Sequence, residues 1–406
     1  MRRPNLPAVL LCACLAAAAP VLSARQDRQE CTTAIFAAGA TADGRPMLWK
    51  NRDTDRLSNK VVLVDDKPYS YLGLVNADHA DGRMVWAGAN AAGFAVANSV
   101  AYNLPHESGE EADLEGIIMA DALRTCETVG EFERYLARRT GPDLGAQANF
   151  LAMDAKGGAA IFETHNHGFR RLDAGASPAR YLANTNFART GVADQGAGYL
   201  RFDRETALLE AAEPRSFTPA WVLEVAARDL GHALLAHPAR SAWKKLPADR
   251  PTWVHTNHTI DRASTASAVV VHGVKPGEPV RHTTVWVALG EPVCAIAVPV
   301  WVAAGLPPAP LRDGEHAPLA AESRRLKDLL RPLRARERQE YADLAKLDNA
   351  AGTGWLPALV ATEQAIMAEA AALLAKNPTP AQLAAFQQAA AERALAVLQS
   401  IKAPAP

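Results

Sequence analysis

The chain has 406 residues, of which 49% are hydrophobic and 21% charged, and its formal net charge is -1. This length allows one large domain with an additional segment. The near-zero net charge argues against a nucleic acid or another polyanion as the partner.

The first residues have the pattern of an export signal. Arg2 and Arg3 precede an apolar, alanine-rich run over 6–22, which is followed by small residues. A basic start, an apolar run and a small-residue end are typical of a secretory signal. A membrane anchor is the alternative, but the run is barely long enough and contains two prolines. The sequence therefore predicts a signal peptide over 1–24 and a periplasmic or secreted protein, and a faint lipoprotein-like box over 11–14 leaves a lipid anchor as an alternative.

Only a short polar stretch, 25–30, separates the predicted signal from Cys31. A second cut before Cys31 would make it the first residue of the mature chain. Its thiol would then be the nucleophile and its own α-amine the base, since a free α-amine has a pKa of roughly 7.7–8.0. A buried structural cysteine is the alternative, and that interpretation suits Cys126 and Cys294, which fall in apolar patterns.

Residues 32–53 contain two short apolar runs separated by a turn signal, which predicts a β-hairpin. The hairpin would bring Arg52 and Asp53 back beside Cys31. A carboxylate there can orient the amine, and a cation, Arg52 or Lys50, can favour the thiolate. Strand alternation places Lys50 and Arg52 on one face and Asp53 on the other, so a bulge or a strand end is needed if Arg52 serves the thiolate. A solvated strand end is the alternative interpretation.

The following stretch alternates short β-rich runs with turn residues and then becomes helical. Asn98 follows a turn and a short strand, and its amide is a suitable donor to the oxyanion of an acyl-transfer intermediate. A loop-capping asparagine is the alternative. The predicted elements are strands over 61–64, 71–75, 84–86 and 94–97 and two helices within 114–139.

The chain from residue 149 to residue 301 is predicted to be mainly β. One strand runs into two asparagines, Asn184 and Asn186, which again places amides at a strand end. The histidines at 165 and 167 lack companions at a zinc-binding spacing and are interpreted as turn residues. The predicted strands are 149–153, 159–163, 169–172, 181–187, 268–271, 284–289 and 293–300, with helices over 200–212 and 219–234.

Several motifs occur in a recognisable order. They are CTT, ADG and NRD between residues 31 and 53, GANAAGFAVANS at 88–99, NTNF at 184–187, RASTASAVVVHG at 262–273 and TTVWVALG at 283–290. Together they resemble the N-terminal-nucleophile hydrolases, in particular the choloylglycine hydrolases and the isopenicillin N acyltransferase-like (linear amide C–N) hydrolases.

This resemblance implies an α+β fold, a four-layer αββα sandwich over residues 31–303. It implies that Cys31 is nucleophile and base after autocatalytic exposure and that Asp53 binds its amine. Asn98 and Asn186 would shape the oxyanion hole and acyl site, with Asn184 as a competitor for Asn186, and Arg262 would support the cluster electrostatically. Lys50 stands where the bile-salt enzymes have arginine, so the resemblance leaves Lys50 and Arg52 both open as the catalytic cation. No cofactor and no metal are implied.

A proline-rich linker at 306–310 precedes a C-terminal region, 311–406, that is rich in strong helix formers. Three helices are predicted over 317–347, 356–375 and 380–401. They are interpreted as a helical appendage that packs on the sandwich or on another subunit.

The sequence therefore predicts an exported cysteine amidase that hydrolyses a linear amide of an N-acylated small molecule through a Cys31 acyl-enzyme. The alternatives are an acyltransferase or a dipeptidase on the same fold, or a non-catalytic binding protein. The expected partner is the small-molecule substrate, without nucleic acid and without an integral membrane segment once the signal is removed. A homo-oligomer is possible.

Overall fold

The computed structural model describes residues 30–105, 113–140, 144–334 and 339–402. The predicted signal peptide (1–24) and residues 25–29 lie outside the described residues, whereas Glu30 is described and is continuous with Cys31.

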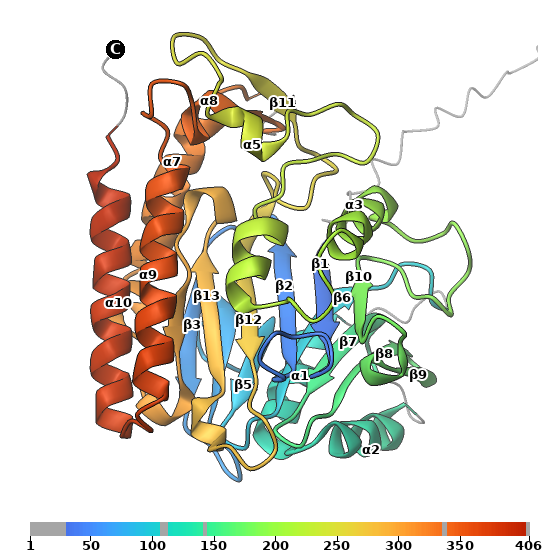
Figure 1. Cartoon of the computed structure of the whole chain (residues 1–406). Coiled ribbons are helices and arrows are strands. Elements are labelled where there is room, and N and C mark those ends of the chain that lie inside the picture. The colour runs from blue at the N-terminus through green and yellow to red at the C-terminus, as the bar shows by residue number, and fades with distance from the viewer. Residues whose placement is uncertain (1–29, 106–112, 141–143, 335–338, 403–406) are drawn as a thin grey trace, which may run out of the picture.

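Two antiparallel sheets face each other in the centre of the molecule (Figure 1). The first has the strand order β10-β1-β2-β12-β13-β14, and β1 and β2 of this sheet contact β6, β7 and β8 of the second. Its strands are β1 (Thr32–Phe36), β2 (Met47–Asp53), β10 (Tyr181–Asn184), β12 (Thr265–His272), β13 (Thr284–Leu289) and β14 (Val298–Val300). The second sheet runs in chain order, with β3 (Asn59–Val64), β4 (Tyr71–Asn76), β5 (Ala87–Asn90), β6 (Ala95–Val100), β7 (Ala148–Met153), β8 (Ala159–His165) and β9 (Gly168–Asp173).

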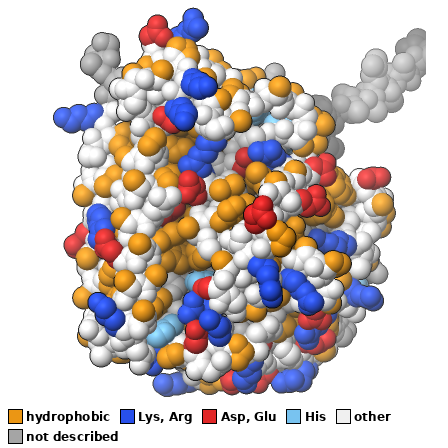
Figure 2. Space-filling view, viewed as in Figure 1, with side chains coloured by type: hydrophobic (Ala, Val, Ile, Leu, Met, Phe, Trp, Pro, Cys, Tyr) orange, Lys and Arg blue, Asp and Glu red, His pale blue; other side chains and the backbone are white. Residues whose placement is uncertain are grey.

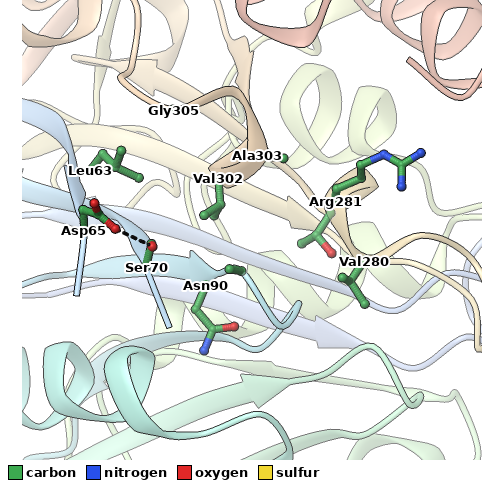
Figure 3. A pocket seen from close by; sticks show the side chains of 11 residues that line it. Leu63, Asp65, Ser70, Asn90, Val280, Arg281, Val302, Ala303 and Gly305 are labelled. Atoms are coloured by element: carbon green, nitrogen blue, oxygen red, sulfur yellow. Dashed lines mark hydrogen bonds between the residues drawn. The ribbon is translucent and has the colours of Figure 1, made fainter. Parts of the chain in front are cut away.

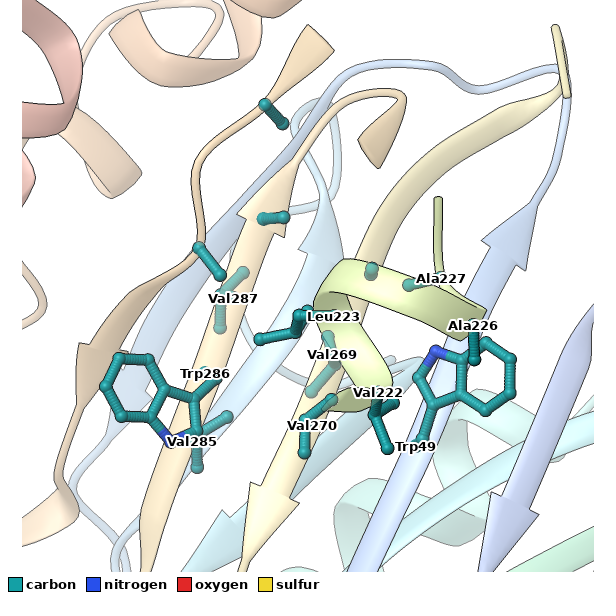
Figure 4. Packing of buried hydrophobic residues seen from close by; sticks show 14 of the residues in the cluster. Trp49, Val222, Leu223, Ala226, Ala227, Val269, Val270, Val285, Trp286 and Val287 are labelled. Carbon is teal, nitrogen blue, oxygen red and sulfur yellow. The ribbon is translucent and has the colours of Figure 1, made fainter. Parts of the chain in front are cut away.

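Helices cover the outer face of each sheet. On the second sheet, α1 (Glu115–Thr125) and α2 (Val129–Arg139) pack their apolar faces over β4 to β9 around a separate hydrophobic cluster. On the first sheet, α3 (Tyr199–Glu210) contacts β10, and the short α4 (Pro219–Trp221) continues into the π-helix η2 (Val222–Ala226) over β12. In Figure 4, Val222 and Leu223 of η2 lie over Val269, Val270 and Trp49. The predicted four-layer αββα arrangement is confirmed.

The C-terminal helices pack beside the first sheet and share its hydrophobic core. They are α6 (Ala309–Arg312), α7 (Pro318–Leu330), α8 (Leu344–Leu347), α9 (Leu356–Leu374) and α10 (Pro380–Ser400), and α9 and α10 both contact β14. The last helix begins where the sequence places it, because Thr379 and Gln382 form a capping box ahead of Pro380. The interpretation of this region as a helical appendage on the sandwich agrees with the packing.

Five predicted elements are wrong in extent, one of them the strand over 181–187, which ends at Asn184. The helix over 317–347 ends at Leu330, and the chain then forms β15 (Tyr341–Asp343), which pairs with β11 (Trp253–His255). The helix over 219–234 ends after the π-turn, and the guanidinium of Arg228, just beyond it, binds Glu363. Residues 84–86 do not form the predicted strand, because β5 begins at Ala87, and the strand over 293–300 is reduced to β14 after a short 3₁₀ turn.

The surface is chemically mixed. The face in Figure 2 carries basic and acidic side chains interspersed with apolar ones. By length and composition α9 could cross a membrane, and it is the one such helix among the residues that the structure describes. The buried residues of α9 include Leu359, Glu363 and Ile366, and Glu363 is bound to Arg228 of the sandwich.

Candidate active site

The predicted hairpin forms, and it returns the end of β2 to Cys31. Thr32 pairs with Asn51 in the β1–β2 register. Residues that pair across an antiparallel sheet share a face, and successive residues alternate. Thr32 therefore lies on the face of Asn51, and Cys31, one residue earlier, lies on the face of Arg52. Cys31 is almost fully buried, with 3% of its surface exposed.

The face of β2 that looks toward the second sheet carries two buried cations. Lys50 donates from Nζ to the Asn98 side-chain oxygen at 2.7 Å and to the Trp86 carbonyl at 2.9 Å. Arg52 donates from Nη1 to the Asn59 side-chain oxygen at 3.1 Å, and its guanidinium lies over the Trp86 ring at 4.5 Å from the centroid. Within the described residues, the Nε and Nη2 atoms of Arg52 have no hydrogen-bond partner.

Burial governs the titration of both cations. It lowers the pKa of Lys50 to about 8 and that of Arg52 to about 10, and in both cases the nearby Cys31 opposes the shift. In the part of the chain that the structure describes, neither cation forms an ion pair with a carboxylate. Two under-compensated positive charges therefore lie on the face of β2 that Cys31 shares.

The β2–β12 ladder has an irregularity at the end of β2, but it lies in β12, and the regular β1–β2 register already places Cys31 on the face of Arg52. The β2–β12 register shifts between Thr265 and Ser267, opposite Asp53 and Arg52. Thr265 donates from its hydroxyl to Asp53 Oδ1 at 2.7 Å. The two faces of β2 thus serve different atoms: Lys50 and Arg52 lie on the thiol side, and Asp53 lies on the side of the peptide bond before Cys31.

That peptide bond is hydrogen-bonded at both ends. The Cys31 backbone nitrogen donates to Asn186 Oδ1 at 2.8 Å, and the Glu30 carbonyl accepts from Arg262 Nη2 at 3.2 Å. Arg262 also donates from Nε to Asp53 Oδ2 at 2.7 Å. The predicted residues Asp53, Asn186 and Arg262 therefore surround the bond whose cleavage would free the Cys31 amine, and in the intact chain the Cys31 nitrogen binds Asn186 and not Asp53.

The two competing asparagines are clearly separated. Asn186 contacts Cys31 directly, and its side-chain nitrogen donates to the Val100 carbonyl at 3.0 Å. Asn184 instead accepts from Arg189 at 3.1 Å and lies beside Ser99. The geometry thus favours Asn186 as the residue of the site.

Asn98 is connected to the site by its hydrogen bond with Lys50. It lies within β6, which continues to Val100, so it is not at the strand end that the sequence predicts. Its side-chain oxygen accepts from Lys50, and no described residue accepts from its side-chain nitrogen. That N–H₂ group is the one that an oxyanion would need.

Sequence reasoning missed two residues that complete the site. Arg201 of α3 is fully buried and donates from Nη1 to the Cys31 carbonyl at 2.7 Å and from Nη2 to Asn186 Oδ1 at 2.8 Å. Glu30 places its carboxylate 3.3 Å from Arg201 Nη2 and 3.0 Å from Arg262 Nη2. The spacing of Arg201, Glu205 and Leu209 on one helix face was the available signal, and charged residues at this spacing usually face solvent.

Burial and charge pairing explain the pKa shifts of Glu30, Arg201 and Arg262. Burial alone would raise the pKa of Glu30, but Arg262 and Arg201 outweigh it, so its pKa is lowered. Burial and the neighbouring Arg262 lower the pKa of Arg201. Burial alone would lower the pKa of Arg262 as well, but the neighbouring Asp53 and Glu30 outweigh burial, so its pKa is raised.

Other candidate features lie away from Cys31. A cavity of about 320 Å³ (Figure 3) is lined by Asp65, Ser70, Asn90 and Arg281, with residues of the 302–305 turn, at the end of the sandwich where β2 begins. Cys126 and Cys294 are buried and free, as expected for core residues, and burial raises the pKa of both thiols. No cluster of three or more potential metal ligands occurs among residues 30–105, 113–140, 144–334 and 339–402.

Comparison with known proteins gives structural likenesses only. No family model and no curated protein matches the sequence. The solved structures that match include a conjugated bile acid hydrolase from Clostridium perfringens, with 12% identity, 63% of this chain and 89% of that chain covered, and a TM-score of 0.37. An N-acylethanolamine-hydrolyzing acid amidase ortholog from Caenorhabditis elegans matches with 15% identity, coverage of 59% and 92%, and a TM-score of 0.39.

A penicillin V acylase from Agrobacterium tumefaciens matches with 15% identity, coverage of 66% and 86%, and a TM-score of 0.39. The names of these three proteins fall within the group of enzymes that the sequence motifs resemble. At such identities and TM-scores they carry no argument about the activity of this chain. The argument for function rests on the geometry around Cys31.

Proposed function

We propose that the protein is an exported cysteine amidase of the N-terminal-nucleophile type, which hydrolyses a linear carbon–nitrogen amide bond of an N-acylated small molecule. One observation carries the proposal. The Glu30–Cys31 peptide bond is held between Asn186 and Arg262, and Cys31 is buried beside under-compensated cations. The signal-like pattern of residues 1–24 supports export.

The chemistry begins with the chain's own peptide bond. The Cys31 sulfur attacks the Glu30 carbonyl carbon, the bond to the Cys31 nitrogen breaks, and a carbon–sulfur bond forms while the thiol proton passes to that nitrogen. Water then hydrolyses the thioester and leaves Cys31 with a free thiol and a free amine. Arg262, which donates to the Glu30 carbonyl, stabilises the negative charge that develops on this oxygen.

The mature site then repeats this chemistry on an external amide. The α-amine of Cys31 acts as the base for its own thiol, because its pKa of roughly 7.7–8.0 suits proton transfer near neutral pH. The sulfur forms a thioester with the acyl group of the substrate, the leaving amine takes the proton, and water releases the acid. The side-chain nitrogen of Asn98 is the donor available for the oxyanion on the thiol side of the site.

Mass spectrometry of the purified protein, combined with an amide screen, tests the proposal. The mature chain is expected to begin at Cys31 and to release acid from N-acyl amino acids, penicillins or bile-salt conjugates. Cys31→Ala is expected to remain uncleaved and inactive, whereas Cys31→Ser can be cleaved but loses most activity. Cys126→Ser, which changes a buried thiol away from the site, is the matched control. An active enzyme that permanently retains residues before Cys31 would contradict the mechanism.

A further inference from the structure

The carboxylate of Glu30 lies between two buried guanidinium groups. Its Oε2 atom is 3.0 Å from Arg262 Nη2 and 3.3 Å from Arg201 Nη2. The side chain of Arg201 is fully buried, that of Arg262 is 7% exposed, and that of Glu30 is 19% exposed. Glu30 belongs to the segment that the proposed maturation removes, so this carboxylate is a temporary occupant of the two arginines.

Removal of Glu30 takes away the carboxylate that lies against Arg201 and Arg262. Asp53 remains on Arg262, so that guanidinium keeps one carboxylate. Arg201 keeps only uncharged acceptors, namely the Cys31 carbonyl, the Thr32 hydroxyl and the Asn186 side chain. A buried cation that loses its counter-ion is costly, so the emptied position favours another anion.

No neighbour on the same helix replaces the lost carboxylate. Glu205 lies one turn after Arg201 in α3 and is fully buried. Burial raises the pKa of Glu205 well above its usual range, which disfavours the charged form of this side chain. Neither of its carboxyl oxygens has a hydrogen-bond partner within the described residues.

We propose that, in the mature enzyme, Arg201 and Arg262 bind a carboxylate on the acyl group of the substrate, so that the preferred amides are those of dicarboxylic acids of glutaryl length. This inference rests on the proposed function. Glu30 is the acyl part of the first amide that Cys31 cleaves, and three carbons, Cα, Cβ and Cγ, separate its carbonyl from its carboxylate. A substrate whose acyl group takes the place of Glu30 at the same sulfur finds both arginines at that distance along the acyl chain.

The test compares two p-nitroanilides, glutaryl and pentanoyl, which differ only in a terminal carboxylate or methyl group. The mature enzyme is expected to show a kcat/KM roughly 10- to 100-fold higher for the glutaryl amide, as for a hydrogen bond between charged groups. Arg201→Met is expected to reduce this ratio to near one. Arg204→Met is the matched control on the same helix, because Arg204 pairs with Asp229 outside the site, and it should keep the ratio.

The outcomes separate the inference from the proposed function. A mature enzyme that cleaves both amides equally well, or an Arg201→Met enzyme that folds and keeps the preference, overturns the inference and leaves the amidase proposal intact. If neither amide is cleaved, or if Arg201→Met does not fold, a second measurement tests the anion site. It compares the rate of Cys31 alkylation in the unsubstituted protein with free glutarate and with free pentanoate. Protection by free glutarate but not by pentanoate supports the anion site, and equal rates with both overturn it.

Discussion

Two groups of buried charges among the described residues differ in how completely the charges are paired. In the C-terminal half, Arg228 binds both oxygens of Glu363 at 2.7 and 2.8 Å and also donates to the Pro292 and Ala295 carbonyls at 2.9 Å. Arg331 is bound in the same manner by Glu291 at 2.6–3.0 Å. We refer to Arg228–Glu363 and Arg331–Glu291 as the C-terminal ion pairs.

Around Cys31 the pairing is incomplete. Lys50 and Arg52 form no ion pair within the described residues, and Arg52 leaves two of its nitrogens without a partner. Arg201 keeps a carboxylate only as long as Glu30 is attached. Complete pairing holds helices to a sheet, whereas an excess of buried positive charge is available to a thiolate, an oxyanion or an anionic substrate.

The largest expected effect comes from breaking a C-terminal ion pair. Glu363→Gln leaves Arg228 buried without its counter-ion and is expected to destabilise the protein by about 3–5 kcal/mol. Denaturant unfolding of the purified protein measures this loss. A cost below about 1 kcal/mol would show that the pair does not hold α9 to the sandwich.

The next effect concerns catalysis without loss of the fold. Asn98→Ala and Asn186→Ala are each expected to lower kcat by roughly 10²–10³, because each removes a polar group that the reacting atoms need. Steady-state kinetics on the mature enzyme give the measurement, with unfolding curves as the control. An unchanged kcat for either variant would make that asparagine structural.

Asp53→Asn tests the carboxylate that Arg262 and Thr265 hold. The variant is expected to retain the fold and to lose activity, and its pH–rate profile should shift to lower pH. The physical reason is that removing a carboxylate disfavours the protonated amine of mature Cys31 and so lowers the pKa of that amine. A profile that keeps the shape of the unsubstituted enzyme would exclude Asp53 as the partner of the amine.

The contributions of Lys50 and Arg52 to the reactivity of Cys31 can be distinguished by their dependence on pH. Because the pKa of Lys50 is about 8, Lys50 is charged below that pH and loses its charge above it, whereas Arg52, with a pKa of about 10, stays charged. Lys50→Met should therefore slow alkylation of Cys31 severalfold at pH 7 and much less at pH 9. Arg52→Met should slow it by a similar factor at both values. Equal rates in both variants and the parent would leave the thiolate dependent on the amine alone.

The smallest expected effect follows from the loss of an exposed ion pair. Arg393→Met removes the ion pair with Glu369 on the outer side of α10 and α9, where both side chains are at least 40% exposed. Exposed pairs contribute about 0–1 kcal/mol because water screens them and side-chain entropy opposes them. A loss as large as that of Glu363→Gln would mean that burial does not explain the contrast between the two pairs.

Much of the fold follows from local sequence. The alternation in 32–53, the turn residues and the cap at Thr379 specify the hairpin and the last helix, and both form as predicted. These patterns depend on neighbours within a few residues, which is why they can be read directly from the chain. The predicted 317–347 helix is wrong at residues 341–343, which form β15 with the distant β11, a pairing that no local pattern shows.

The candidate site likewise has one part that local sequence predicts and another that depends on tertiary packing. The sequence by itself placed Cys31 after a signal-like stretch and brought Arg52 and Asp53 back to it through one hairpin. Only the tertiary structure decided that Asn186 rather than Asn184 contacts Cys31, and that Arg201 from a helix 170 residues away holds both the Cys31 carbonyl and the Glu30 carboxylate. The reason is physical: burial and pairing of a charge depend on which elements pack over it, and composition and spacing along the chain do not contain that information.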